Sequence, residues 1–144
     1  MPTEVLYSTK ARATGGRDGI SGTLDDAFKV TLSTPKELGG DGKDGNNPEQ
    51  LFASGYAACF LGAMKFVAGN SEALKMKIPD DTAVTSTVGI GPRSEGGFGL
   101  DVKLEVSLPG IAKDVAIKLV EEAHQVCPYS NATRGALDIN PVVV

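Results

Sequence analysis

The side chains with the strongest chemistry in this sequence are two thiols, Cys59 and Cys127. Cys59 falls in the middle of an apolar segment, and Cys127 ends a second helical segment directly before Pro128. A thiolate can attack a peroxide oxygen and become a sulfenic acid, with which a second thiol condenses to a disulfide. Either cysteine alone could instead be a small buried hydrophobe. We expect the two apolar helical faces to meet in one core, which would bring the thiols together.

Arg17 and Glu49 lie in the kinds of position from which loops and helix starts offer functional groups. Arg17 stands in a glycine-rich segment, and Glu49 follows Asn47 and Pro48 at a predicted helix start. A guanidinium beside a thiol lowers the thiol pKa, because it favours the charged form. A carboxylate can hold that guanidinium through two parallel hydrogen bonds.

The composition narrows the classes of protein to consider. A length of 144 residues fits a single domain, residues 1–144. Two cysteines are too few for a disulfide framework or a four-cysteine zinc site, and the single histidine, His124, excludes a His-rich metal site. A net charge of −4 argues against a nucleic-acid partner, whose binding surface would be basic. We expect no bound metal or cofactor.

The chain shows no targeting or membrane segment by pattern. It begins Met1-Pro2-Thr3-Glu4, without the basic and then apolar segments of a signal peptide. Its longest uncharged run, residues 50–64, is shorter than the roughly 18 residues that cross a bilayer. We expect a cytoplasmic protein with no membrane partner. In a reducing cytosol, a cysteine pair is more often catalytic or redox-active than structural.

The N-terminal third predicts three short strands and a loop. Residues 5–13, 19–24 and 27–32 are expected to form an antiparallel meander, with a glycine-rich turn at 15–19. Residues 35–47 hold four glycines and several charges, and are expected to form a mobile loop.

A long helix is predicted over residues 48–67, with Asn47 as its N-cap, Pro48 at its first position and Gly69 as its C-terminal cap. It is apolar almost all round, so it must be buried on most sides. One chain of this length cannot easily supply that burial, which favours a partner subunit.

The remaining residues predict a hairpin, a second helix and a last strand. Residues 81–90 and 98–108 alternate between apolar and polar side chains, as strands with one wet face do. Residues 111–127 carry an apolar helical stripe that Pro128 ends, followed by a helical turn at 130–134 and a strand at 137–144. His124 is predicted to be solvated on the polar side of its helix. The fold class is therefore α+β, with antiparallel sheets packed around a long buried central helix.

Three segments resemble the organic hydroperoxide resistance (Ohr) proteins of the Ohr/OsmC family. They are ATGGRDG at residues 13–19, NPEQLFASGYAACF at 47–60 and CPYSNATRG at 127–135, and they occur in the family's order. The middle segment is the most specific, and the third favours the Ohr branch over its OsmC sister.

The resemblance implies a catalytic role for each of four residues. Cys59 would be the peroxidatic thiol and Cys127 the resolving thiol, with Arg17 activating the thiolate and Glu49 holding Arg17. The product would be an alcohol, and the Cys59–Cys127 disulfide would be reduced by dihydrolipoamide or a lipoylated protein. Family members are intertwined homodimers, and the apolar surroundings of Cys59 suit an alkyl or lipid hydroperoxide.

The spacing of Glu49 and Cys59 adds a geometric expectation. Ten residues on one unbroken helix correspond to about 15 Å along its axis. Glu49 would then be too far away to serve Cys59 of its own chain. Two such helices crossing antiparallel near Ser54 and Gly55 would remove the difficulty, with Cys59 from one subunit and Glu49, with Arg17, from the other.

Other functions remain open at this point. One is an OsmC-like peroxidase of broader specificity or a general thiol–disulfide exchanger, although the Cys-x-x-Cys motif of thioredoxin-type proteins is absent. Another, of a different class, is a non-enzymatic dimer that binds small molecules and has inert cysteines.

Overall fold

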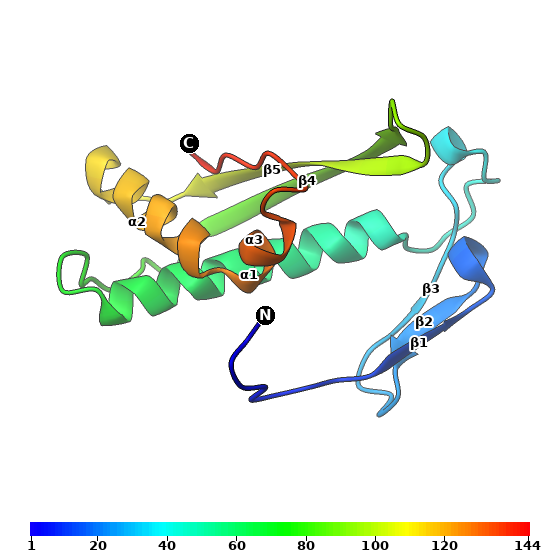
Figure 1. The fold of residues 1–144 in the computed structure, drawn as a ribbon, viewed down its shortest axis with the longest axis horizontal. Coiled ribbons are helices and arrows are strands. Elements are labelled where there is room, and N and C mark those ends of the chain that lie inside the picture. The colour runs from blue at the N-terminus through cyan, green and yellow to red at the C-terminus, as the bar shows by residue number, and fades with distance from the viewer. The chain divides into compact units, whose positions relative to one another are not determined.

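A computed structural model describes residues 1–144 and divides them into two compact units, Met1–Leu51 and Phe52–Val144 (Figure 1). The first unit holds a small antiparallel sheet and the start of the long helix. The second holds the rest of that helix, a hairpin and two further helices.

The sheet of the first unit is the predicted meander in a shorter form. It consists of β1 (Ala11–Thr14), β2 (Ile20–Thr23) and β3 (Lys29–Thr31), which pair antiparallel in that order. The prediction of strand over residues 5–10 was wrong, because β2 ends opposite Ala11 and nothing in this chain pairs with the residues before Lys10. The apolar side chains of Val5, Leu6 and Tyr7 are exposed as a result.

Residues 35–47 contain more local structure than their glycine content suggested. They include a 3₁₀ turn, η2 (Lys36–Leu38), and a bridge pairs Leu32 with Asn46. The mobility of this loop stays a prediction.

The long helix α1 (Pro48–Asn70) starts as the sequence predicted. The Asn47 side chain accepts a hydrogen bond from the Gln50 backbone N–H at 2.8 Å, and the Gln50 side chain accepts one from the Asn47 N–H at 3.0 Å. This reciprocal capping box satisfies two backbone donors that the first turn would leave free. The predicted end was wrong: Gly69 lies inside the helix, which continues to Asn70, whose side-chain amide donates to the Phe66 carbonyl at 2.8 Å.

The sheet of the second unit is the predicted hairpin with one added strand. Strands β4 (Ala83–Pro92) and β5 (Phe98–Ser107) pair antiparallel along their full length. The predicted last strand is reduced to β6 (Val142–Val143), which starts directly after Pro141 and pairs parallel to β5. The parallel pairing departs from the expected all-antiparallel sheet, and it follows because α2 and α3 carry the chain back across before β6 begins.

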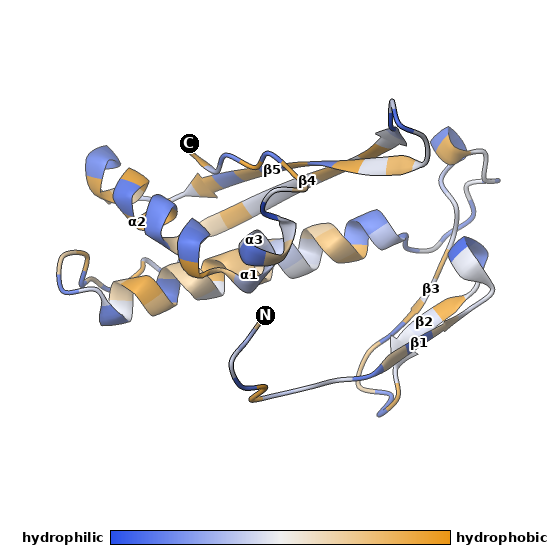
Figure 2. Ribbon diagram, in the orientation of Figure 1, coloured by the Kyte–Doolittle hydropathy of each residue, from blue (hydrophilic) through white to orange (hydrophobic).

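Helices α2 (Lys113–Val126) and α3 (Pro128–Thr133) complete the second unit. Alternate residues of β5 and the apolar stripe of α2 close over α1 (Figure 1). The buried core is formed chiefly by Tyr56, Phe60, Met64, Leu104, Val106 and Leu119. Figure 2 shows apolar colour along most of α1 and polar colour on much of α2, in keeping with a buried and a half-exposed helix.

One side of α1 is not covered within a single chain. Its exposed positions include Ser54, Ala58, Gly62, Lys65 and Phe66, and Phe66 is 59% exposed. The predicted burial on most sides is therefore incomplete in one copy. By length and composition α1 would also suffice to cross a bilayer, a test that core helices of soluble proteins meet as well.

Candidate active site

The glycine-rich segment around Arg17 forms the tight turn that its composition predicted. Gly15 and Gly16 have φ values of 74° and 59°, a left-handed region that favours glycine. A side chain on Gly19 would collide with the Thr14 carbonyl oxygen. The chain thereby places Arg17 in a single 3₁₀ turn, η1 (Gly16–Asp18), between β1 and β2.

Arg17 pairs with Glu49, which lies in the first turn of α1. Arg17 Nη1 donates to Glu49 Oε2 at 2.9 Å, and Nη2 donates to Oε1 at 2.5 Å, so the contact is bidentate. The Arg17 hydrogen bonds hold the pKa of Glu49 below its usual range, and Glu49 in turn raises the pKa of Arg17. The pair therefore keeps a fixed guanidinium in its charged form.

The second unit brings Cys59 and Cys127 together. Their Sγ atoms are 3.7 Å apart, and both are free thiols. A disulfide requires about 2.05 Å, so the sulfurs would have to close by about 1.7 Å. Cys59, in the middle of α1, is half-buried, whereas Cys127 is fully buried at the joint where α2 ends and α3 begins.

The environment of Cys59 does not favour its thiolate within one chain. Burial raises the pKa of the Cys59 thiol above its ordinary value, and the neighbouring Cys127 adds to the rise. The backbone N–H of Tyr129, in α3, acts in the opposite direction as a hydrogen-bond donor to the sulfur. A reactive thiolate at Cys59 would therefore need a further positive charge.

Aromatic rings lie on α1 and α3, the two helices next to which the thiols meet. Phe52, Tyr56 and Tyr129 pack with ring centroids 5.6–6.0 Å apart. A side chain on Gly55 would come within 2.9 Å of the Tyr129 hydroxyl, so the absence of one lets that ring pack close against α1.

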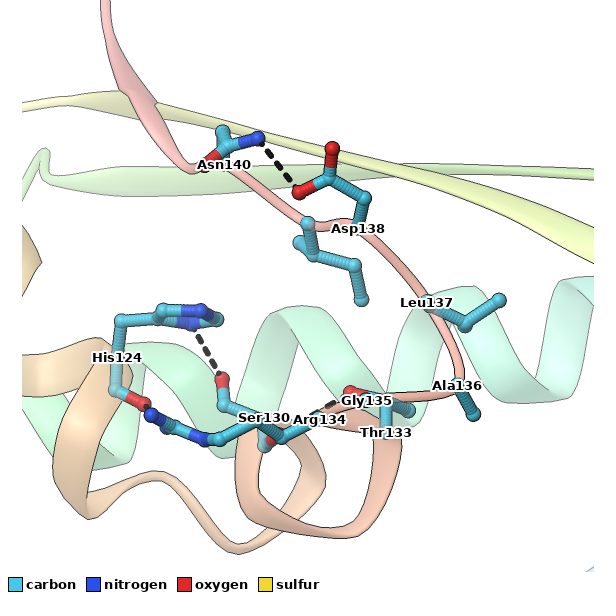
Figure 3. A pocket seen from close by; sticks show the side chains of 10 residues that line it. His124, Ser130, Thr133, Arg134, Gly135, Ala136, Leu137, Asp138 and Asn140 are labelled. Carbon is cyan, nitrogen blue, oxygen red and sulfur yellow. Dashed lines mark hydrogen bonds between the residues drawn. The ribbon is translucent and has the colours of Figure 1, made fainter.

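Sequence reasoning missed a hydrogen-bonded group next to the thiols. The fully buried Ser130 hydroxyl lies 2.9 Å from the Tyr56 hydroxyl and 2.9 Å from His124 Nδ1. The prediction that His124 is solvated was wrong: its ring is half-buried and faces a hollow of about 550 Å³ (Figure 3). The helical pattern could not reveal this, because the break at Pro128 folds α3 back against the side of α2 that looks polar.

The structure therefore forms two pairs from the four candidate residues. Arg17 meets Glu49 within the first unit, and Cys59 meets Cys127 within the second. No group of three or more His, Cys, Asp or Glu side chains is placed to hold a metal ion.

The fold mixes helices and sheets around one long helix, and a free thiol in that helix faces a second thiol. These two features define the class of protein. A family model described as OsmC-like protein matches residues 40–142, and the chain belongs to this family.

Within the family, the chain is similar to proteins named for organic hydroperoxide resistance. It is 55% identical to the organic hydroperoxide resistance protein of Xanthomonas axonopodis pv. citri, over 96% of this chain and 94% of that protein. It is 40% identical to organic hydroperoxide resistance protein OhrB of Bacillus subtilis, over 93% and 95% of the two chains. This agrees with the branch that the third sequence segment favoured.

Solved structures show the same fold. A putative organic hydroperoxide resistance protein from Vibrio cholerae, crystallised with captopril in one of its active sites, matches with a TM-score of 0.90 and 45% identity. That match covers 99% of this chain and 95% of the other. The OhrB structure of Bacillus subtilis matches with a TM-score of 0.84 and 36% identity, over 97% of this chain and all of the other. The fold class predicted from the sequence is confirmed.

Proposed function

We propose that this protein is a cysteine-based peroxidase that reduces organic hydroperoxides to alcohols. The observation that carries the proposal is the 3.7 Å separation of a half-buried and a fully buried thiol in one chain. The names of the relatives support a role in organic hydroperoxide resistance.

The first step needs a thiolate that a substrate can reach, and Cys59 is the more accessible thiol. Its sulfur bonds to the terminal oxygen of the hydroperoxide, the O–O bond breaks, and the departing alkoxide takes up a proton and leaves as the alcohol. Cys59 is oxidised to the sulfenic acid.

The second step uses Cys127. Its sulfur attacks the Cys59 sulfur, an S–S bond forms, and the S–O bond breaks. The hydroxide leaves as water with the proton that Cys127 gives up. A buried resolving thiol at 3.7 Å from the oxidised sulfur suits this step, because the sulfenic acid is captured before a second peroxide oxidises it further.

Activation of Cys59 requires a positive charge, since burial raises its pKa. We propose that Arg17 of the partner subunit supplies this charge in a homodimer, held by Glu49 of the partner subunit. The unbroken course of α1 supports the arrangement, because its rise keeps Glu49 about 15 Å along the helix from Cys59 of the same chain. The uncovered small residues of α1, Ser54, Ala58 and Gly62, would allow a second α1 to approach closely.

The surroundings of Cys59 support the proposed substrate class, and the proposed reductant rests on the family resemblance. The aromatic rings of Phe52 and Tyr129, which are not fully buried, favour a hydroperoxide with an alkyl or lipid body over hydrogen peroxide. A dihydrolipoyl dithiol would attack the disulfide at the accessible Cys59 sulfur, release Cys127 and close its own ring as a disulfide. We propose a cytoplasmic location, where such a dithiol stays reduced.

The test mixes the reduced protein with one equivalent of cumene hydroperoxide and follows the loss of two hydrogens by intact mass. Dihydrolipoamide or thioredoxin is then added. We expect disulfide formation and turnover with dihydrolipoamide. Turnover with thioredoxin alone would support the broader exchanger, and an absence of oxidation would support the non-enzymatic binding protein.

Two variants assign the roles. Cys59→Ser should abolish peroxide consumption, and Cys127→Ser should stop at an oxidised Cys59. Normal turnover of Cys127→Ser with a dithiol would show that the resolving role is wrongly assigned.

A further inference from the structure

The short helix α3 carries both groups that meet Cys59 from the C-terminal part of the chain. Cys127 is its N-cap, and the backbone N–H of Tyr129 in its first turn faces the Cys59 sulfur. Six residues make fewer than two helical turns, which are not stable alone in water. The 3.7 Å between the sulfurs therefore depends on whatever fixes α3 to the rest of the unit.

One buried hydroxyl links α3 to both other helices, in addition to the packing of Tyr129 on α1 and the hydrogen bond from Arg134 to α2. Ser130 of α3 lies 2.9 Å from the hydroxyl of Tyr56 on α1 and 2.9 Å from Nδ1 of His124 on α2 (Figure 3 shows the contact with His124). Ser130 and Tyr56 are both fully buried, so neither hydroxyl has water as an alternative partner. A single side chain thus joins three helices, and we call this group the Ser130 clamp.

Building on the proposed function, we propose that Ser130, Tyr56 and His124 are positioning residues for the step in which Cys127 resolves oxidised Cys59. The Ser130 clamp holds α3 so that the Cys127 sulfur stays within reach of the Cys59 sulfur. In that step the S–S bond forms, the S–O bond of the sulfenic acid breaks, and the proton of Cys127 leaves with the hydroxide as water. The hydroperoxide of the first step is the oxidant.

The Ser130 clamp is sensitive to the charge of His124, because each hydroxyl of the clamp has only one hydrogen to donate. With Nδ1 unprotonated, Ser130 donates to His124 and accepts from Tyr56, and both contacts are 2.9 Å long. With Nδ1 protonated, His124 must donate to Ser130. The hydrogen of Ser130 or that of Tyr56 then needs another acceptor, and the available one is Thr133 Oγ1, 3.5 Å from the Tyr56 oxygen. The protonated clamp is therefore weaker.

The surroundings of His124 keep the ring neutral near pH 7. Burial lowers the pKa of His124, and the positive charge of Arg134 adds to the effect. Arg134 donates to the His124 carbonyl at 2.9 Å, and Asp138 lines the same hollow as the ring (Figure 3). From α1, the ring of Phe60 faces His124 with centroids 6.3 Å apart. Arg134 is thus the charged group that acts on the ring, while the Asp138 carboxylate on the same hollow accepts a hydrogen bond from Asn140.

The test compares four variants of the full protein with a matched control. Tyr56→Phe and Ser130→Ala each remove one hydroxyl of the clamp. His124→Ala removes the third partner, and His124→Asn keeps a hydrogen-bonding group near the Nδ1 position that does not titrate. The control is Ser86→Ala on β4, because the buried Ser86 hydroxyl has no hydrogen-bond partner and joins nothing.

The first arm follows one turnover with one equivalent of tert-butyl hydroperoxide, by acid quench, thiol alkylation and mass. The loss of one net hydrogen bond of about 1.4 kcal/mol corresponds to about a tenfold change in rate. We expect Tyr56→Phe, Ser130→Ala and His124→Ala to form the disulfide about tenfold more slowly, with a sulfenic acid that dimedone traps. Consumption of the Cys59 thiol should change by less than about threefold, and Ser86→Ala and His124→Asn should stay near the wild type.

The second arm separates this inference from the proposed function. The reduced proteins are equilibrated with oxidised dithiothreitol, which forms the Cys59–Cys127 disulfide without any peroxide while it is itself reduced to the dithiol. The same three variants should favour the disulfide about tenfold less than the wild type. If hydroperoxide leaves the wild-type thiols intact but this second difference is seen, the peroxidase proposal fails and the positioning role stands.

The pH dependence excludes a merely structural role. Between pH 7.5 and pH 5, disulfide formation in the wild type should slow by a larger factor than in His124→Asn. Unfolding in urea checks that each variant is folded, and if Ser130→Ala is not, the milder Tyr56→Phe decides. Disulfide rates and equilibria within twofold of the wild type in every folded clamp variant, or an equal loss in Ser86→Ala, would overturn the proposal.

Discussion

Two ion pairs of nearly equal length allow a test of how burial sets the strength of a charge pair in this chain. Arg17 and Glu49 approach to 2.5 Å with side chains 35% and 12% exposed. Lys43 and Asp41 approach to 2.6 Å, but their side chains are 80% and 54% exposed. If distance alone decided, the two pairs would be equally strong.

The structure predicts that the two ion pairs differ in strength. A hydrogen bond to a charged group contributes roughly 1.5–3 kcal/mol when shielded, and exposed ion pairs contribute about 0.2–1 kcal/mol. Glu49 is mostly shielded and the contact is bidentate, while Arg17 is one-third exposed and so partly screened. We expect a coupling energy of about 1–1.5 kcal/mol for Arg17 with Glu49. For Lys43 with Asp41 we expect none that can be measured.

The assay is a double-mutant cycle for each pair in urea unfolding at pH 7. The variants are Arg17→Gln, Glu49→Gln and their combination, and Lys43→Gln, Asp41→Asn and theirs. Protein concentration is held constant, because an oligomer changes its apparent stability with concentration. A coupling for Arg17 and Glu49 no larger than that for Lys43 and Asp41 would refute the reasoning.

The sign of the pH dependence follows from the lowered pKa of Glu49. Its contribution is complete above its ordinary value of about 4.5, and it is lost as the pH falls through the lower value of the folded protein. Arg17 stays charged over the whole range in which the protein can be studied, so it adds no pH dependence of its own.

Three further outcomes are expected. Phe66→Asp should convert the proposed homodimer to monomers in sedimentation analysis, while Phe98→Asp, at a similarly exposed position in the hairpin, should not; equal effects would place the interface elsewhere. The pH dependence of iodoacetamide alkylation should give Cys59 a lower pKa in the wild type than in Arg17→Gln, and identical values would remove Arg17 from thiol activation. Phe60→Ala should lose about 3–5 kcal/mol of unfolding free energy, because the ring is fully buried, and a loss below 1 kcal/mol would contradict that burial.

The sequence predicted helices and strands well where interactions between neighbouring residues determine them. The Asn47 cap and the alternation of β5 are properties of neighbouring residues, and the structure has both. The strand over residues 5–10 and the last strand depend on distant partners, which a local pattern does not contain, and both came out shorter or absent. Gly69 shows the same limit: it lies inside the helix, directly after the buried Val67 and Ala68, although glycine often ends a helix.

The same distinction between local and distant interactions applies to the candidate site. Residue types and helical faces were enough to predict that Cys59 and Cys127 meet. The family resemblance implied the contact between Glu49 and Arg17. The Ser130 clamp was not predictable, because it depends on the direction in which the chain turns at Pro128. Through that turn His124, which looks solvated on a helical wheel, is half-buried and hydrogen-bonded to the buried Ser130 hydroxyl.

The position of Cys127 has a consequence for how the protein accommodates a disulfide. Cys127 belongs to neither α2 nor α3: its N–H closes the last turn of α2 on the Ala123 carbonyl, and its carbonyl accepts the N–H of Asn131 in α3. Torsions at this one joint can absorb the 1.7 Å that separates two thiols from a disulfide, so neither helix has to melt and re-form. In the proposed function this bond forms and breaks once in every turnover, and the helices on either side of Cys127 keep their structure while it does so.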